Sequence, residues 1–215
     1  MAETSKGQSL LENAYKLATP EDNKAYYAEF AATYDADFAG ALGYHYPVAI
    51  ASVYRERATE RDRPVADIGC GTGLVAEALA LAPAEIDGID ISAEMLARAA
   101  EKGLYRATLH ADLTADLAPL ARDYGAVVSA GTFTSGHLGP EPLEPLLGIA
   151  RPGALFVLGV NKAFFVKAGF EAVIRGLEGR GAITDLGLVE VAMYARPGHE
   201  HSDDRAYALT YRKRA

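Results

Sequence analysis

The chain has 215 residues, of which 50% are hydrophobic and 23% charged, so it can form one globular domain with a full core. Its formal net charge of −8 argues against a general nucleic-acid binder, because phosphate contacts need clustered Lys and Arg. Cys70, the single cysteine, excludes an intrachain disulfide, and no apolar run is long enough to span a bilayer. The first residues lack the apolar core of a signal peptide. We expect a cytoplasmic monomer or homodimer without membrane or nucleic-acid partners.

The first 60 residues have a helical and strongly aromatic pattern. Pro20, followed by two acidic residues, predicts a helix that runs through Tyr34, and Pro47 predicts the start of another helix. We interpret residues 1–60 as a helical lid and residues 61–215 as one compact domain. Tyr27 and Tyr34 are the aromatic residues of this lid that we expect to contact a ligand.

From residue 65 onwards, short apolar runs alternate with helical periods, which is typical of a parallel sheet with crossover helices. The predicted strands cover residues 65–68, 85–90, 106–110, 126–130 and 154–159. The predicted helices between and after them cover residues 73–82, 92–102, 143–150 and 164–180, with Ser92 as a cap. Arg-Pro-Gly at 151–153 predicts a sharp reversal before the fifth strand.

Residues 186–195 and 205–211 predict two strands that form an antiparallel hairpin at the end of the chain. The predicted fold is therefore α/β and Rossmann-like. It has a doubly wound, mostly parallel seven-stranded sheet, an antiparallel C-terminal hairpin and the N-terminal helical lid. In such sheets, ligands bind at the carboxyl ends of the strands.

Three glycines at every second position, Gly69, Gly71 and Gly73, join the first strand to the following helix. Glycine permits a positive φ and lets a ligand approach the main chain closely. Read from Gly71, the sequence matches the G-x-G-x-x-A dinucleotide fingerprint, with Asp90 at the ribose-binding position. Read from Asp67, an acidic residue precedes the glycines, and a carboxylate there favours a cationic amino-acid group over a pyrophosphate.

The second pattern resembles motif I of the class I S-adenosylmethionine-dependent methyltransferases. The resemblance extends from about residue 27 onwards. It includes Ile-Asp-Ile-Ser at 89–92, Ala-Asp-Leu at 111–113 and Arg-Pro-Gly at 151–153. It implies S-adenosylmethionine as the cofactor and methyl transfer to an O- or N-nucleophile as the activity.

The resemblance also implies roles for individual residues. The glycine turn would approach the methionyl part of the cofactor, and Asp67 would balance its ammonium group. Asp90 would accept hydrogen bonds from the ribose hydroxyls and Asp112 from the adenine amino group. The complete predicted cofactor site consists of Tyr27, Tyr34, Asp67, Gly69, Cys70, Gly71, Gly73, Asp90, Ile91, Met95, Asp112, Leu113 and Ser129.

Methyl transfer mainly requires that the nucleophile and the methyl group are aligned, but a general base can assist an O- or N-nucleophile. His137 lies in the loop after the fourth predicted strand and is the predicted base. The alternative is that His137 only structures its own glycine-rich loop. His45 is a second choice, and no residue spacing resembles a metal site.

The acceptor is predicted to be a small molecule, since the sequence lacks a basic face and an N-P-P-Y motif. Residues 34–35, 103–105 and 129–140 resemble the small methyltransferase-like proteins of the Williams-Beuren syndrome region group. Two other functions stay open. The overlap with the dinucleotide fingerprint allows an NAD(P)-dependent oxidoreductase. The absence of an unambiguous base allows a non-catalytic S-adenosylmethionine-binding protein.

Overall fold

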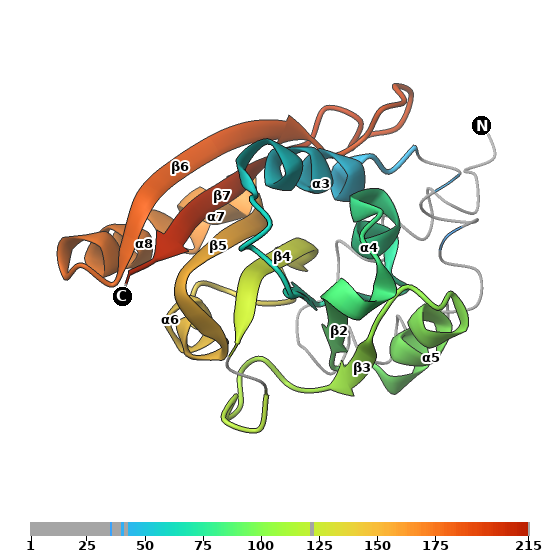
Figure 1. Cartoon of the computed structure of the whole chain (residues 1–215). Coiled ribbons are helices and arrows are strands. Elements are labelled where there is room, and N and C mark those ends of the chain that lie inside the picture. Colours follow the sequence, from blue (N-terminus) through green and yellow to red (C-terminus); the bar gives the residue numbers. More distant parts are fainter. Residues whose placement is uncertain (1–34, 36–39, 41–42, 121–122, 215) are drawn as a thin grey trace.

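The structure is a computed structural model, and it describes residues 35, 40, 43–120 and 123–214 (Figure 1). The predicted helix through Tyr34 and the predicted ligand contacts of Tyr27 and Tyr34 lie outside the described residues. None of the helices in the described ranges is long and apolar enough to cross a membrane. The boundary proposed at residue 60 stays a prediction.

A seven-stranded sheet forms the centre of the molecule, with the order β3-β2-β1-β4-β5-β7-β6. The parallel strands are β1 (Val65–Ile68), β2 (Ile86–Asp90), β3 (Ala107–His110), β4 (Tyr124–Phe133) and β5 (Ala150–Asn161). β7 (Arg205–Lys213) is antiparallel to both of its neighbours, β5 and β6 (Ile183–Ala192). The predicted α/β fold, mostly parallel with an antiparallel C-terminal pair, is confirmed.

Helices cover both faces of the sheet because alternate strand residues point to opposite faces. On one face, α3 (Tyr46–Arg57) and α4 (Leu74–Leu79) share a core with Val65, Val128 and Val157. On the other face, α6 (Leu143–Leu146) and α8 (Phe170–Gly179) share a core with Ile68, Val127 and Phe156. Figure 1 shows α3 beside α4, and α8 at the opposite end of the sheet from α5.

Short capping and turn elements complete the connections. α5 (Ala93–Glu101) begins after Ser92, whose Oγ accepts a hydrogen bond from the Met95 N–H, as predicted. α7 (Lys162–Lys167) begins after Asn161, whose Oδ1 accepts from the Phe164 N–H. Pro47 lies in the first turn of α3, so the predicted helix start is confirmed. The 3₁₀ turns η2 (Pro83–Glu85) and η3 (Leu147–Ile149) precede β2 and β5.

Several boundaries differ from the sequence prediction, and the three largest differences are these. β4 continues through residues 131–133, which the sequence pattern suggests are loop. Residues 151–153 do not reverse the chain but lie within β5. Ala150 pairs with Tyr124 and Leu155 pairs with Ala126, so β5 advances by five residues where β4 advances by two. This irregularity includes Gly153 at φ +84° and is a bulge. The single helix predicted over residues 164–180 is divided at Gly169, which has a φ of +74°.

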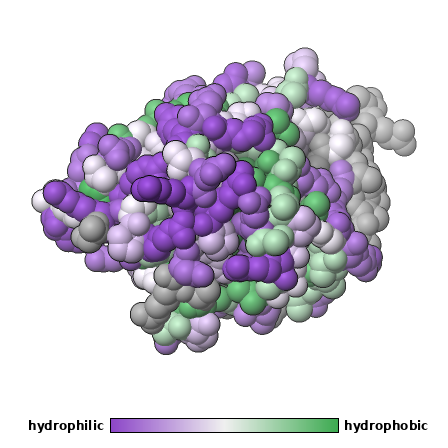
Figure 2. Space-filling model, in the orientation of Figure 1, coloured by the Kyte–Doolittle hydropathy of each residue, from purple (hydrophilic) through white to green (hydrophobic). Residues whose placement is uncertain are grey.

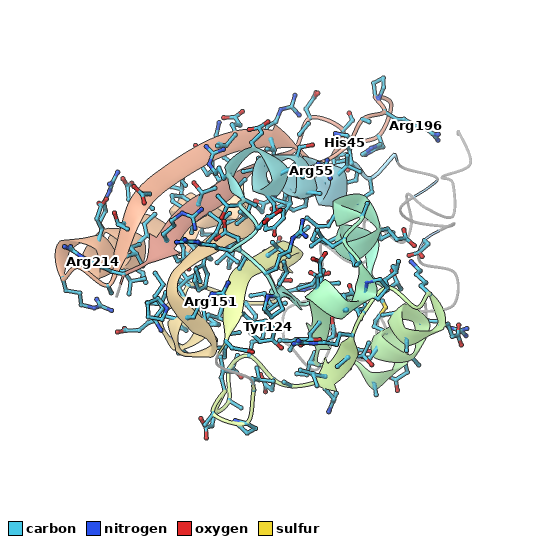
Figure 3. All side chains as sticks on the ribbon, viewed as in Figure 1. His45, Arg55, Tyr124, Arg151, Arg196 and Arg214 are labelled. Atoms are coloured by element: carbon cyan, nitrogen blue, oxygen red, sulfur yellow. The ribbon has the colours of Figure 1, made fainter. Side chains whose placement is uncertain are left out.

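The amino edge of the sheet is held by polar contacts. Tyr124 and Arg106 both donate hydrogen bonds to the buried Asp87 carboxylate, at 2.7 to 2.9 Å. Arg151 donates to the main-chain oxygens of Arg61 and Arg63. Figure 3 shows Tyr124 and Arg151 near the beginnings of β4 and β5. On the face seen in Figure 2, hydrophilic side chains predominate, with smaller hydrophobic areas between them.

Candidate functional site

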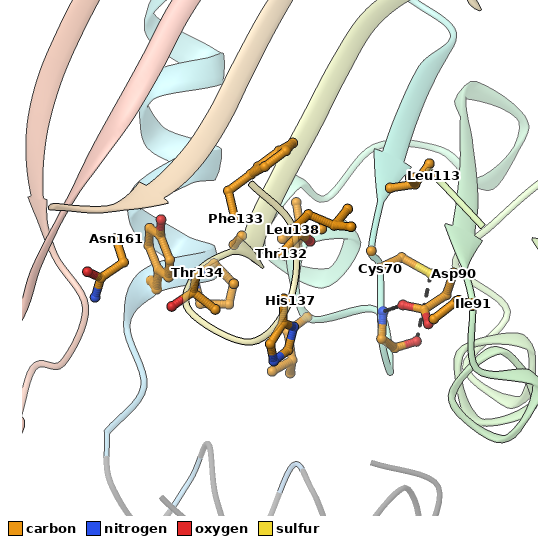
Figure 4. A pocket seen from close by; sticks show the side chains of 18 of the residues that line it. Cys70, Asp90, Ile91, Leu113, Thr132, Phe133, Thr134, His137, Leu138 and Asn161 are labelled. Carbon is orange, nitrogen blue, oxygen red and sulfur yellow. Dashed lines mark hydrogen bonds between the residues drawn. The ribbon is translucent and has the colours of Figure 1, made fainter. Parts of the chain in front are cut away.

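A cavity of about 470 Å³ lies at the carboxyl ends of the parallel strands (Figure 4). Its walls include the glycine turn after β1, Asp90 at the end of β2, residues 111–114 after β3, and Asn161 at the end of β5. The order of the strands reverses between β1 and β4, and in open α/β sheets this switch point is where ligands bind. The fold therefore places the predicted motifs around one cavity of ligand size.

The glycine turn has a positive φ at Gly69, Gly71 and Gly73, of +62°, +53° and +93°. A Cβ on Gly69 would lie 2.1 Å from Thr132 Oγ1, whereas a Cβ on Gly71 would meet no described atom within 4 Å. Gly69 is thus required by packing against β4. Gly71 borders open cavity, where a ligand can reach its main chain.

Gly73 precedes α4 and does not border the cavity. A Cβ there would lie 3.2 Å from the Tyr105 ring, so its surroundings explain the glycine without a ligand.

Asp90 links the glycine turn to the end of β2. Its Oδ2 accepts a hydrogen bond from the Gly71 N–H at 2.8 Å, and its Oδ1 accepts from the Ser92 N–H at 2.8 Å (Figure 4 draws the Gly71 bond). Burial raises the pKa of Asp90, and these main-chain bonds oppose that rise. A carboxylate has about four acceptor positions, so Asp90 keeps acceptor capacity for two ligand hydroxyls.

Asp67 lies beneath the turn and does not border the cavity. Tyr105 donates its hydroxyl to Asp67 Oδ2 at 2.7 Å, while Oδ1 has no hydrogen-bond partner among the described residues. Burial raises the pKa of Asp67 to about 7, the Tyr105 hydrogen bond opposes the rise, and the charge of Asp90 adds to it. Direct contact between Asp67 and a cofactor is therefore not part of this geometry.

Cys70 borders the cavity but is buried, and burial raises the pKa of its thiol well above the ordinary value. A neutral, buried thiol is a poor nucleophile, so Cys70 contributes packing and not covalent chemistry.

Asp112 follows β3, borders the cavity and is exposed. Thr114 donates its main-chain N–H and its hydroxyl to the same oxygen, Asp112 Oδ1, at 2.8 and 2.7 Å. The other oxygen, Oδ2, is left to accept from a ligand. Among the other predicted positions, Ile91, Met95 and Leu113 also border the cavity.

At the end of β4, Ser129 is fully buried and does not border the cavity. Its hydroxyl donates to Thr132 Oγ1 at 2.8 Å, and Thr132 donates to the main-chain oxygen of Ile68 at 3.1 Å. This chain of hydrogen bonds connects β4 to the end of β1. The cavity wall at this point consists of Ala130, Gly131 and Thr132.

His137 borders the cavity and, viewed as in Figure 4, lies between Thr134 and Asp90. Its main-chain N–H donates to the Thr134 oxygen at 3.1 Å, which stabilises the loop. Burial lowers the pKa of its imidazole to about 4, so the ring is neutral at neutral pH and is a weaker base than an ordinary histidine. His45, the second choice, does not border the cavity.

Most of the part of the cavity beyond His137 was not predicted from the sequence. Its walls come from three parts of the chain that meet only in the fold: the segment that leads into α3, the end of β5 with α7, and the segment after β6. These residues are Tyr44, Tyr46, Asn161, Ala163, Phe164, Lys167, Met193 and Tyr194. Most of them are aromatic or apolar.

Asp35 connects the first part of the chain to the glycine turn. Thr72, which borders the cavity, donates its hydroxyl to Asp35 Oδ1 at 2.6 Å. Lys102 lies 2.5 Å from Asp35 Oδ2 and 2.8 Å from Glu77 Oε1. Within the described ranges, no group of His, Cys, Asp and Glu residues could hold a metal ion.

A comparison with family models identifies part of this architecture. Residues 65–151, from β1 to the beginning of β5, match the model of the methyltransferase domain. This part of the chain, which includes the glycine turn, is thus similar to methyltransferase domains. A search of curated proteins found no significant match.

Solved structures with the same fold cover nearly the whole chain. The cyclase SpnF, described as a [4+2]-cyclase, has a TM-score of 0.64 at 15% identity, over 93% of this chain and 97% of its own. A candidate S-adenosyl-L-methionine-dependent methyltransferase from Methanococcus maripaludis has a TM-score of 0.59 at 17% identity. The alignment covers 89% of this chain and 94% of that protein. A Thermotoga maritima methyltransferase, for which histamine is the suggested acceptor, has a TM-score of 0.58 at 12% identity. The alignment covers 88% of this chain and 98% of that protein.

At these identities, the likeness concerns the fold, and the neighbours differ in the reactions named for them. The prediction of a methyltransferase that uses S-adenosylmethionine is confirmed at the level of the domain and the fold. The comparisons do not support the narrower resemblance to the Williams-Beuren group. The structure shows where the individual site residues lie, but their roles in binding and catalysis stay predictions.

Proposed function

We propose that this protein transfers a methyl group from S-adenosylmethionine to an oxygen or nitrogen of a small molecule. The observation that carries the proposal is the single cavity that joins the glycine turn and Asp90 at one end to an aromatic wall at the other, with His137 bordering the same space. A methyl donor and an acceptor must share one site, because the transfer is an in-line displacement.

The residues at the glycine end fit the cofactor. Gly71 leaves its main chain open, Asp90 has acceptor capacity for the two ribose hydroxyls, and Asp112 Oδ2 can accept from the adenine amino group. When bound, the cofactor supplies a methyl group on a positively charged sulfur. Asp67, beneath the turn, does not border the cavity, so it can act on the cofactor's ammonium group only through space and only in its ionised form.

His137 is proposed as the group that removes the proton of the acceptor. Its neutral imidazole borders the cavity next to the loop after β4. Residues 130–135 and His137 border the space in which donor and acceptor would meet.

Two measurements test the proposed function. Calorimetric titration with S-adenosylhomocysteine should give saturable one-site binding, and incubation with S-adenosylmethionine and a panel of phenols and amines should release S-adenosylhomocysteine. Absence of cofactor binding contradicts the proposal. Tight binding without turnover across a broad panel favours the non-catalytic alternative instead.

The oxidoreductase alternative is not proposed. The dinucleotide-binding fold has the parallel order 3-2-1-4-5-6, whereas β7 is inserted here in the reverse direction between β5 and β6. A fluorescence titration with NADH provides the direct check and should show no binding.

A further inference from the structure

The acceptor end of the cavity differs in charge from the cofactor end. Of the acidic residues, only Asp90 and Asp112 border the cavity among the described residues, and they follow β2 and β3. Lys167 is the last residue of α7, which follows β5, and it also borders the cavity. In the sheet, β1 and β4 separate β5 from β2 and β3, so Lys167 and the two carboxylates come from opposite sides of the switch point. The described acceptor end thus contains one cation and no carboxylate.

Lys167 has no ion pair with any described residue. Lys162, on the same helix, pairs with Glu190 at 2.5 Å. Glu171 is four residues after Lys167 and does not pair with it. A positive charge at the end of a helix also complements the helix dipole, which is a purely structural explanation for Lys167. If Lys167 instead binds a ligand, its replacement should change the affinity for anionic ligands, whereas a role in the helix dipole alone should not.

Asn161 provides a second donor at the same end. Its Oδ1 accepts from the Phe164 N–H at 3.0 Å, which fixes the orientation of the amide. Its amide nitrogen therefore faces Met193 Sδ at 3.8 Å, and thioether sulfur is a weak acceptor. Asn161 is buried and borders the cavity, so a ligand oxygen is a better partner for this N–H group.

From this distribution we infer that the methyl acceptor is a small aromatic molecule that carries a carboxylate or a similar anionic group. The anion binds at Lys167, and the aromatic body packs against the aromatic wall that includes Phe164 and Tyr194. A local cation is needed for such a ligand, because the net charge of −8 repels anions. This inference rests on the proposed function and assigns the substrate class to the same site.

The test uses the full chain saturated with S-adenosylhomocysteine and pairs of aromatic carboxylates with their primary amides, such as 4-hydroxybenzoate and 4-hydroxybenzamide. Titration should show that the carboxylates bind about fivefold more tightly than the amides, as for a partly exposed ion pair. Since salt screens such a pair, the preference should shrink at high ionic strength.

Lys167→Gln should abolish the preference for the carboxylates and leave the affinity for the amides unchanged. Lys162→Gln, on the same helix but outside the cavity, should leave both affinities unchanged. Equal binding of carboxylates and amides, no binding of any carboxylate at millimolar concentration, or a preference that survives in Lys167→Gln overturns the inference. Failure of S-adenosylhomocysteine to bind in the first titration overturns the proposed function instead.

Discussion

Gly71 allows a sharp test of the cofactor site. In Gly71→Ala, the new Cβ meets no described atom within 4 Å, but it projects at the edge of the cavity. The φ of +53° makes an L-residue unfavourable, by about 1–2 kcal/mol. For a chain of this size, such a loss lowers the Tm by about 2–8 °C. If a ligand approaches this main chain, the methyl group should also raise the Kd for S-adenosylhomocysteine by about tenfold or more.

Gly103 provides the matched control. It has a φ of +64°, a Cβ there would meet no described atom within 4 Å, and it does not border the cavity. Gly103→Ala should therefore lose about the same stability as Gly71→Ala and bind S-adenosylhomocysteine like the wild type. The comparison separates a local backbone effect from a ligand effect.

Gly69→Ala completes the series. Its Cβ would lie 2.1 Å from Thr132 Oγ1, so its stability loss should exceed that of the other two variants. Thermal unfolding and calorimetric titration measure the two quantities. Wild-type affinity in Gly71→Ala, or an equal loss of affinity in Gly103→Ala, would refute the reasoning.

Three other variants test the remaining assignments. Asp90→Ala should weaken S-adenosylhomocysteine binding by about 1.5–3 kcal/mol, since hydrogen bonds to a charged group are lost; calorimetry that finds unchanged affinity removes Asp90 from the site. His137→Ala should lower turnover while cofactor affinity is retained. In the wild type, the rate should stay level from pH 8 to about 5, because burial lowers the pKa of His137 to about 4; a decline centred near the ordinary pKa of about 6.5 speaks against this base. Asp67 has its pKa raised to about 7 by burial, so the folded state holds this proton more tightly than the unfolded chain does. Its contribution to stability is therefore present at low pH and is lost as the pH rises from about 4 to 7. Asp67→Asn should raise the Tm of the cofactor-free protein more at pH 8 than at pH 5, and a difference that does not grow with pH contradicts this assignment.

The sheet was predictable where local and tertiary signals agree. β1 is a short apolar run followed by glycines, and both of its faces are buried, so its bounds match the prediction. β4 was predicted too short because Gly131 and Thr132 are common in loops, whereas here they continue the strand. The Arg-Pro-Gly sequence at 151–153 is typical of a turn, but pairing with β4 holds it within β5. Tertiary pairing overrides local preference at both places.

At the proposed cofactor end, the positions of Asp90 and Asp112 on the cavity were predictable from the sequence. Asp90 ends β2 and Asp112 comes shortly after β3, and the carboxyl ends of parallel strands meet at one edge of the sheet. The acceptor end has no such signal. Lys167 and Tyr194 are brought together only when α7 and the segment after β6 pack beside β5, and no local pattern records that packing.

The glycine turn is subject to two separate evolutionary constraints. Thr132 occupies the space beside Gly69, so a chain that had lost its cofactor would still need glycine there to fold. Gly71 borders only the cavity, and without a ligand it would be free to change at a modest cost in stability. Packing in the fold therefore explains glycine at the first position of the turn, whereas at the second position the positive φ and the proposed ligand are the two reasons for glycine.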